Sequence, residues 1–287
     1  MKNIIWLASY PKSGNTWFRI FLSGLLGDEK EPTDINKISS THGIASARHI
    51  FDELTGIEAS DLSHDEVDIL RPGLYNRLSN DANQSLFIKV HDAYTFLPDN
   101  RPLFPPSATK GIIYIIRNPL DVAVSNSNHN SCTVQQSIDA MCDDNHGLCA
   151  KTKKLKDQLR QKIGTWSSHV TSWANAKDQD VHVVRYEDMK LSPLETFTAA
   201  IRFAGLDFGR TAIGAAIQKS SFGEMQKQEK EKGFKERPIG APSFFRKGEV
   251  GSWREQLTTE QVRQIIHAHG TVMKKFGYLT EDGETVY

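Results

Sequence analysis

Short apolar runs recur along the chain, separated by longer stretches in which apolar residues return with a helical period. Runs of strand length lie at 4–7, 86–90, 111–116 and 181–184. Strands that alternate with helices form a parallel sheet that is covered on both faces. The pattern therefore predicts an α/β fold in which one domain, 1–287, holds a parallel sheet of about five strands with helices on both faces.

Three stretches interrupt this alternation. Residues 29–83 are polar and predict helices and loops over one edge of the sheet. Residues 131–162 form an insertion that ends in a predicted basic helix, 151–162. Residues 225–242 are highly charged and then rich in proline and glycine, a composition typical of a mobile loop.

Charge and composition narrow the class of protein. The 35 basic and 35 acidic residues cancel, so the net charge gives no reason to expect a nucleic-acid or membrane partner. No run approaches the ~20 apolar residues of a membrane helix, and the first residues lack the layout of a signal peptide. Three cysteines are too few for a disulfide framework. We therefore expect a cytoplasmic location.

Cysteine and histidine gather in the second of these stretches. Cys132, Cys142, His146 and Cys149 supply potential zinc ligands within a short distance along the chain. Their spacing fits no common zinc pattern, and small, soft residues also suit a loop. We expect no metal here.

The stretch Tyr10-Pro-Lys-Ser-Gly-Asn-Thr-Trp17 lies between the first predicted strand and a predicted helix. Free backbone N–H groups and the positive end of the helix dipole make such a turn an anion site. Lys12 adds a positive charge, and Gly14 lets a phosphate approach the backbone closely. Ser13 and Thr16 add hydroxyl donors. The residue order differs from the ATP-binding loop G-x-x-x-x-G-K-[ST], because the lysine here precedes the glycine.

Two polar residues mark the end of the second predicted strand. Lys89 and His91 are two positions apart in Phe87-Ile-Lys-Val-His91, so their side chains are expected on the same face. Ligands of open α/β sheets bind at the carboxyl ends of the strands, and histidine accepts protons near neutral pH. A catalytic base is one interpretation, and a surface or structural histidine is the other. Asp92 either orients His91 or caps a turn.

The third predicted strand ends in a cation, Arg117. Asn118-Pro119 then begins a predicted helix that carries Asp121 in its first turn and Ser125 further along. An arginine at a strand end and a serine on the next helix can hold one phosphate from two sides. The alternative is an ion pair between Arg117 and Asp121, with a surface serine.

Four segments in order resemble the motifs of the cytosolic-type sulfotransferases, which use 3′-phosphoadenosine-5′-phosphosulfate. Tyr10–Trp17 resembles their 5′-phosphosulfate loop, with Asn15 where threonine is usual, as in bacterial members. Lys89-Val-His91 is similar to their Lys-Thr-His. Arg117-Asn-Pro-Leu-Asp-Val-Ala-Val-Ser125 matches their 3′-phosphate motif over its whole length. Arg246-Lys-Gly-Glu-Val-Gly-Ser-Trp253 matches their C-terminal nucleotide motif.

The resemblance implies a P-loop-like fold, similar to nucleotide kinases, and sulfuryl transfer to an acceptor hydroxyl or amine without a metal. His91 would be the general base, Lys12 would stabilise the leaving phosphate, and Lys89 would contact the transferred group. Tyr186 would bind the nucleotide, and Phe222 would stack on its base. The residues implied at the donor site are Lys12, Ser13, Gly14, Asn15, Thr16, Trp17, Arg117, Ser125, Tyr186, Ser221, Phe222, Arg246, Lys247 and Gly248.

Two other classes of protein stay open. A P-loop kinase or NTPase would need a carboxylate at a strand end for magnesium. A non-catalytic nucleotide-binding module would not need His91 beside Lys89. For a sulfotransferase, the acceptor is expected to be a small molecule, a phenol or alcohol of specialised metabolism, bound by 29–83, 131–162 and 225–242. Thr271-Val272 lacks the flanks of the family's dimerisation motif, so monomer and homodimer both remain possible.

Overall fold

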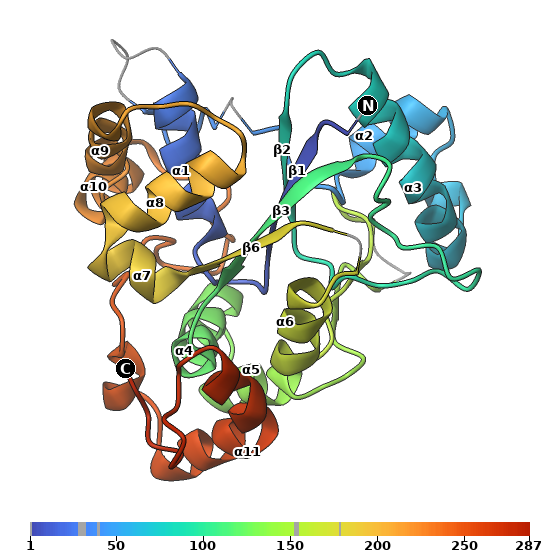
Figure 1. Ribbon diagram of the computed structural model, residues 1–287. Helices are drawn as coiled ribbons and strands as arrows, with labels where there is room; N and C mark the ends of the chain where they lie inside the picture. The colour runs from blue at the N-terminus through green and yellow to red at the C-terminus, as the bar shows by residue number, and fades with distance from the viewer. Residues whose placement is uncertain (1, 28–32, 39–40, 152–154, 178) are drawn as a thin grey trace. The chain divides into compact units, whose positions relative to one another are not determined.

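The main sheet has four parallel strands in the order β2-β1-β3-β6 (Figure 1). The computed structural model describes residues 2–27, 33–38, 41–151, 155–177 and 179–287. The strands are β1 (Ile4–Ser9), β2 (Leu86–Val90), β3 (Thr109–Ile116) and β6 (Val181–Arg185). β1 and β2 pair in parallel, from Ile4 opposite Leu86 to Ala8 opposite Val90.

The apolar runs explain why these segments form a parallel sheet. Every residue of β1 is buried, and so is every residue of β3 from Gly111 to Ile116. Strands that are buried on both faces are almost entirely apolar because helices cover both sides of such a sheet. The predicted α/β fold is confirmed, with four strands in the main sheet where about five were expected. A separate antiparallel pair joins β4 (Gly147–Leu148) and β5 (Gln161–Lys162).

The chain divides into two compact units. The first comprises Met1–Tyr10, His42–Tyr114 and Asp143–Val183. Besides β1, β2 and most of β3, it contains α2 (Arg48–Thr55), the 3-10 turn η1 (Ala59–Asp61), α3 (His64–Asp81) and α6 (Trp166–Ala174). α3 begins with a capping box, in which Ser63 and Glu66 satisfy each other's backbone N–H groups. The expected helices within 29–83 are therefore present.

The second unit comprises Pro11–Thr41, Ile115–Cys142 and Val184–Tyr287. Its helices include α1, which packs on α9, and α4, which packs on α5. Phe21 on α1 packs on Phe197 of α8 with ring centroids 4.1 Å apart, at the centre of an aromatic core. The elements are α1 (Asn15–Leu26), α4 (Pro119–Asn130), α5 (Val134–Met141), α7 (Tyr186–Leu191), α8 (Pro193–Phe203), α9 (Arg210–Lys219), α10 (Phe222–Lys232), η2 (Ser252–Glu255) and α11 (Thr259–Lys275).

The basic helix expected at 151–162 is wrong. Residues 152–154 lie outside the described residues, and 155–162 form an extended segment that ends in β5. Leu159 N–H donates to the Ser46 carbonyl at 2.7 Å, and Arg48 N–H donates to the Asp157 carbonyl at 3.0 Å. The lysines here flank no apolar stripe that a helix could bury, so pairing with a neighbouring segment satisfies the backbone instead.

The mobile loop expected at 225–242 is wrong over its first part. α10 continues to Lys232, since its glutamine, lysine and glutamate residues are good helix formers. One face of α10 is buried: the Glu229 carboxylate accepts the N–H groups of Phe244 and Phe245 at 2.8 and 2.9 Å. Because charged residues usually face solvent, the sequence pattern did not indicate that this polar face is buried.

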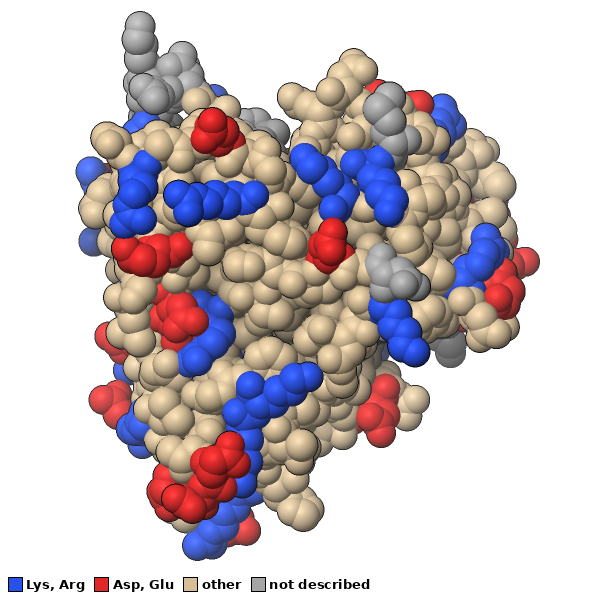
Figure 2. All heavy atoms as spheres, viewed as in Figure 1, with Lys and Arg blue, Asp and Glu red and all other residues tan. Residues whose placement is uncertain are grey.

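Basic and acidic residues are interspersed on the face drawn in Figure 2, in keeping with the zero net charge. Among the described residues, no helix has the length and apolar character needed to cross a bilayer.

Candidate active site

The loop after β1 has an unusual backbone. β1 ends at Ser9 and α1 begins at Asn15, with Gly14 as its N-cap at φ 105°. Lys12 also lies in the left-handed region, at φ 69°. A Cβ on Gly14 would come within 2.6 Å of Cδ2 of Tyr186, so both its backbone angle and this close approach require glycine. The loop therefore presents its N–H groups at the start of a helix, as an anion site needs.

Arg117 lies directly after β3 and is 7% exposed. Its guanidinium carbon lies 4.3 Å from the ring centroid of Tyr186. Nη1 donates to the Lys12 carbonyl at 3.4 Å, and Nη2 donates to the Glu249 carbonyl at 3.0 Å. Arg117 Nε and Ser13 Oγ are buried and have no hydrogen-bond partner in the described parts of the chain. Buried donors without a partner are costly, and a bound phosphate would satisfy them.

Asp121 does not pair with Arg117 in the described structure. Its carboxylate accepts the N–H of Gly251 at 2.8 Å and the N–H of Trp253 at 3.1 Å. This holds the C-terminal motif, which begins at Arg246, against the start of α4. The sequence predicted Asp121 in the first turn of a helix, with an ion pair to Arg117 as the alternative, because no local pattern connects it to a segment so far along the chain.

Tyr186 contacts both the loop after β1 and the C-terminal motif. Its hydroxyl donates to the Gly248 carbonyl at 2.9 Å, and burial raises the pKa of its phenol. The Phe222 ring packs directly on Gly248, since a Cβ there would overlap the ring. Lys190 Nζ lies 5.6 Å from the ring centroids of both Trp17 and Phe222. Burial and the charge of Arg117 lower the pKa of Lys190.

Lys12 contacts two residues that sequence reasoning missed. Its Nζ lies 3.1 Å from Nδ1 of His129 and 4.2 Å from the ring centroid of Phe244. His129 follows Ser125 by four residues on α4, so the two share a helix face, which is the one signal that could have found it.

The remaining donor-site predictions lie on elements of the second unit. Arg246 Nη1 donates to Gln256 at 3.4 Å, and Lys247 forms an exposed ion pair with Glu255 at 3.2 Å. Asn15 and Thr16 are buried in the first turn of α1, Ser125 is half-buried on α4, and Ser221 is the N-cap of α10. Every residue predicted for the donor site thus belongs to the second unit.

His91 lies in the first unit, directly after β2. Its Nδ1 lies 2.9 Å from the carbonyl oxygen of Ser9. A carbonyl only accepts hydrogen bonds, so Nδ1 carries the proton and the lone pair of the neutral ring is on Nε2. The ring is thereby fixed in the tautomer that a general base needs. Lys89 is paired with Leu7 inside the sheet, and its N–H donates to the Gly43 carbonyl at 3.0 Å.

Two buried side chains hold the backbone of His91. His169 Nε2 lies 3.0 Å from the His91 carbonyl oxygen, and Tyr114 OH lies 2.9 Å from His169 Nδ1. Because the carbonyl accepts, His169 donates through Nε2 and receives the Tyr114 hydroxyl at Nδ1. Burial lowers the pKa of His169 to about 4, which keeps this ring neutral. Sequence reasoning missed both residues because they join the site only through the fold.

Asp92 forms a buried ion pair rather than a simple turn cap. Its carboxylate accepts hydrogen bonds from both terminal nitrogens of Arg71 on α3, at 3.2 and 2.9 Å. The partner lies 21 residues earlier in the chain, so no local pattern could reveal it.

None of the three cysteines forms a disulfide. Cys142 Sγ lies 3.8 Å from Nε2 of the buried His269 in the second unit, whereas His146 and Cys149 belong to the first. Burial raises the pKa of the Cys142 and Cys149 thiols. Among the described residues there is no group of three or more His, Cys, Asp or Glu side chains that could hold a metal ion.

A glycine-containing loop between a buried strand and a helix, with a buried arginine after a neighbouring strand, is typical of a P-loop-like protein, and such a loop suits a phosphorylated ligand. Comparison with known proteins identifies the family within this class. The sulfotransferase domain family matches residues 2–277, and the chain belongs to this family. It is a sulfotransferase.

Individual relatives are similar over most of the chain. Flavonol 3-sulfotransferase of Flaveria bidentis is 27% identical, over 95% of this chain and 84% of its own. Human sulfotransferase 1C2 is 30% identical, over 89% of this chain and 78% of its own. The crystal structure of retinol dehydratase in complex with androsterone and inactive cofactor PAP superposes with a TM-score of 0.63 at 18% identity, over 94% of this chain and 80% of that one. The last similarity establishes the fold alone.

Proposed function

We propose that this protein transfers the sulfuryl group of 3′-phosphoadenosine-5′-phosphosulfate to a hydroxyl, or an amine, of a small molecule. The observation that supports this most directly is the pair of buried donors, Arg117 Nε and Ser13 Oγ, which have no hydrogen-bond partner among the described residues. A ligand with phosphate groups would supply the missing acceptors.

The donor nucleotide would be held by side chains of the second unit. Arg117 and Ser125 would bind the 3′-phosphate, and the loop from Lys12 to Trp17 would bind the 5′-phosphosulfate. Trp17 and Phe222 offer aromatic faces for the adenine. Lys12 would stabilise charge on the oxygen that leaves with the nucleotide, so no metal is required for that purpose.

His91 would act as the general base. Its Nε2 would take the proton of the acceptor hydroxyl while the acceptor oxygen forms a bond to sulfur. The bond from sulfur to the 5′-phosphate oxygen breaks, and 3′-phosphoadenosine-5′-phosphate leaves. In such a transfer, positioning and electrostatic stabilisation carry most of the rate enhancement. Lys89 would contact the transferred group.

The acceptor would be a small phenol or alcohol, with the reaction in the cytoplasm. One relative is a flavonol 3-sulfotransferase, and the retinol dehydratase structure contains androsterone. These two names support a small-molecule acceptor for this chain as well. The acceptor would be bound by residues of 29–83, 131–162 and 225–242, within one domain over 1–287.

Calorimetry of the purified protein with 3′-phosphoadenosine-5′-phosphate and with ATP, both without magnesium, tests the donor site. We expect selective binding of the 3′-phosphate nucleotide, because Arg117 and Ser125 would have no partner in ATP. Equal or tighter binding of ATP would contradict the donor assignment and favour a kinase or NTPase. Transfer of label from the ³⁵S-sulfonate donor to a panel of phenols, alcohols and amines then tests catalysis, since a non-catalytic module would bind the nucleotide without transfer.

A further inference from the structure

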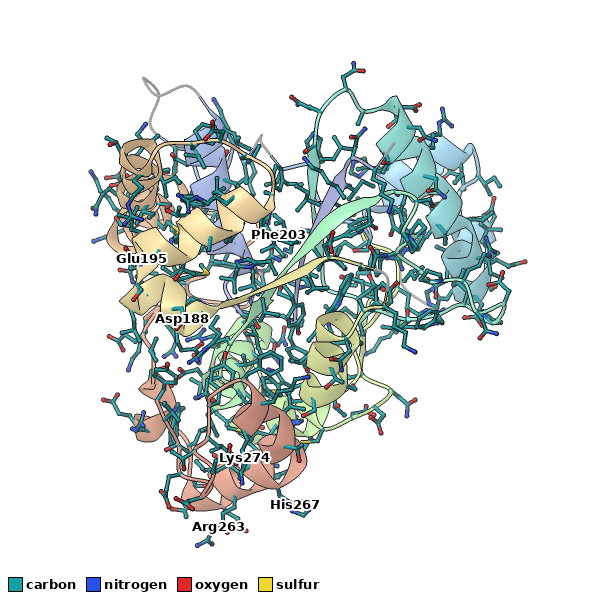
Figure 3. All side chains as sticks on the ribbon, viewed as in Figure 1. Asp188, Glu195, Phe203, Arg263, His267 and Lys274 are labelled. Atoms are coloured by element: carbon teal, nitrogen blue, oxygen red, sulfur yellow. The ribbon has the colours of Figure 1, made fainter. Side chains whose placement is uncertain are left out.

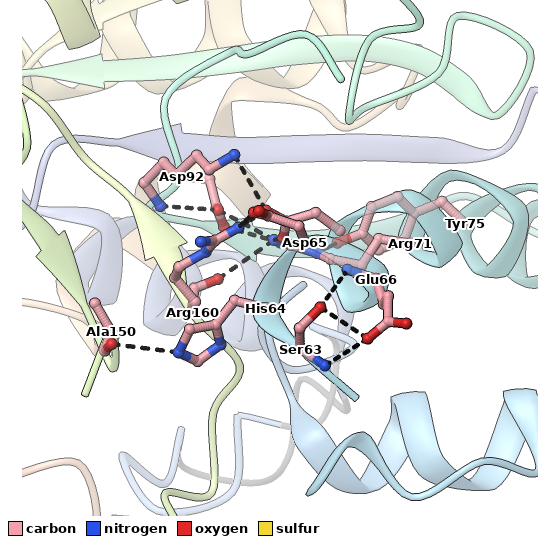
Figure 4. Close-up of polar contacts among 11 residues, drawn as sticks. Ser63, His64, Asp65, Glu66, Arg71, Tyr75, Asp92, Ala150 and Arg160 are labelled. Atoms are coloured by element: carbon pink, nitrogen blue, oxygen red, sulfur yellow. Dashed lines mark hydrogen bonds and ion pairs between the residues drawn. The ribbon is translucent and has the colours of Figure 1, made fainter. Parts of the chain in front are cut away.

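Asp92 follows the proposed base, His91, and is 1% exposed. In Figure 4 its carboxylate faces the guanidinium of Arg71, which reaches it from α3. The contact is a two-point fork: Nη1 to Oδ1 at 3.2 Å and Nη2 to Oδ2 at 2.9 Å. Oδ1 also accepts the N–H of Lys162 in β5, at 3.2 Å. A carboxylate held at both oxygens in a planar fork has one orientation.

The Arg71 side of the pair is equally fixed. Its Nε donates to the Tyr75 hydroxyl at 2.9 Å, and its Nη1 lies 3.3 Å from Asp68. Burial alone would lower the pKa of Arg71, but the charge of Asp92 and the Tyr75 phenol raise it. Asp68 has further partners in Arg160 and Lys162, so three cations and three carboxylates balance, counting Asp65.

The same short segment is held from the other side by α6. Trp173 Nε1–H donates to the Asp92 carbonyl at 2.9 Å, and His169 donates to the His91 carbonyl at 3.0 Å. The His91 ring itself is held by the Ser9 carbonyl. α6 therefore fixes two carbonyl oxygens, whereas the Arg71 fork fixes the side chain that follows the base directly.

We propose that Arg71 and Asp92 are positioning residues, which act together to hold the backbone of His91 so that its Nδ1–H stays on the Ser9 carbonyl. The proposal rests on the proposed role of His91 as base. The resemblance to sulfotransferases supplies no such role, because the family usually has leucine after the histidine.

Positioning and stability place different demands on this ion pair. A buried ion pair can often be replaced by neutral residues with no loss of stability, whereas removal of one partner leaves an uncompensated charge. Stability alone therefore does not require this pair. Displacement of a catalytic group by about 1 Å can cost about 100-fold in rate, so a fixed orientation has a direct use here.

The test compares Asp92→Asn, Arg71→Met and the double variant. The amide oxygen introduced by Asp92→Asn can still accept the Lys162 N–H, so this single variant removes the charge of the fork alone. The double variant removes the fork together with the contacts of Arg71 to Tyr75 and Asp68. We expect Arg71→Met to lower Tm most, and the double variant to recover most of that loss. We expect kcat to stay about tenfold below wild type in the double variant, with the Kd for 3′-phosphoadenosine-5′-phosphate unchanged. Recovery of kcat together with Tm would overturn the proposal.

Asp65→Asn is the matched control. It removes the same charge from the same network at a carboxylate that is 76% exposed, and it should change neither kcat nor Tm appreciably. If Arg71→Met does not fold, Asp92→Asn decides the question, because a kcat equal to that of Asp65→Asn would overturn the proposal.

A spectroscopic readout is independent of turnover. In ¹⁵N-histidine-labelled protein, the signal of protonated Nδ1 of His91 is identified by its loss in His91→Ala. We expect this signal to broaden or shift to the mixed-tautomer position in the double variant, and to be unchanged in Asp65→Asn. An unchanged His91 signal in the double variant would overturn the proposal. Failure of the wild-type protein to bind the nucleotide would instead contradict the proposed function and leave this readout valid.

Discussion

The surroundings of His91 and those of Arg117 differ in how their buried polar groups are satisfied. In the second unit, Arg117 Nε and Ser13 Oγ are buried and lack a partner among the described residues. In the first unit, the groups around His91 are paired: Asp92 with Arg71, and His169 with Tyr114. A ligand site keeps donors that only the ligand satisfies, whereas a catalytic group that must not move is surrounded by completed hydrogen bonds.

This difference predicts that substitutions of His91 and its partners affect turnover, whereas substitutions of Arg117 and of the loop after β1 affect nucleotide binding. The largest expected effect is that of His91→Ala. Loss of a general base lowers kcat by about 100- to 10,000-fold, while the Kd for 3′-phosphoadenosine-5′-phosphate should stay unchanged. Steady-state kinetics and calorimetry on the same preparation measure both quantities.

His267→Ala is the control for that substitution. His267 is exposed and points away from α11 (Figure 3), so its loss should change neither quantity. Turnover at the wild-type rate in His91→Ala would remove His91 as the base. A large loss of nucleotide affinity would erase the distinction between the two units.

Arg117→Ala should have the reverse effect. The substitution removes a buried fork of donors, and hydrogen bonds to charged groups are worth about 1.5–3 kcal/mol each. We expect the Kd for the nucleotide to rise about 10- to 100-fold, with a smaller change in kcat at saturating donor. Arg263→Ala, at an exposed arginine on α11 that points to solvent, is the matched control (Figure 3). An unchanged Kd in Arg117→Ala would exclude this arginine from the phosphate site.

The sequence was most informative where the chemistry is local. The loop at 10–17 and the turn after β3 each combine strand end, glycine or proline, and cation within a few residues, and the structure places them on the expected elements. Strand positions could be predicted for the same reason, since an unbroken apolar run has few alternatives inside an α/β core.

Contacts between residues far apart in the chain could not be predicted from the sequence. Asp121 reaches the N–H groups of 251 and 253, Arg71 reaches Asp92, and His169 reaches the His91 carbonyl, each across many intervening residues. A single sequence carries no trace of such contacts. The charged stretch at 226–232 was predicted as part of a mobile loop but forms a helix. Lysine and glutamate are good helix formers as well as residues that favour solvent.

The pH dependence of folding stability also tests the comparison of the two units, because each unit contains a buried histidine whose pKa is lowered. Burial lowers the pKa of His169 and of His269 to about 4, from an unfolded value near 6.5. Between those values the unfolded chain binds a proton that the folded chain does not, so stability falls as the pH drops from 6.5 towards 4. Each histidine should cost about 2 kcal/mol of unfolding free energy at about pH 5 relative to neutral pH.

His169→Gln and His269→Gln should therefore flatten the pH dependence of urea unfolding to a similar extent. Only His169→Gln should also lower kcat, since His169 holds the His91 carbonyl and His269 lies in the other unit. An equal loss of kcat in both variants would indicate a general effect of destabilisation. A pH dependence as steep as that of the wild type in His169→Gln would mean that this ring is not held neutral by burial.

The smallest expected effect comes from the cap of α3, the helix that carries Arg71. Ser63 accepts the N–H of Glu66 and closes a capping box at an exposed helix end (Figure 4). Ser63→Ala should cost about 1 kcal/mol of unfolding free energy by urea denaturation. It should leave kcat unchanged, because the Arg71 fork is two turns further along the helix and keeps its partners. A fall in kcat comparable to that of the Arg71 and Asp92 variants would show that His91 responds to any loosening of α3, and that the fork has no separate part in its position.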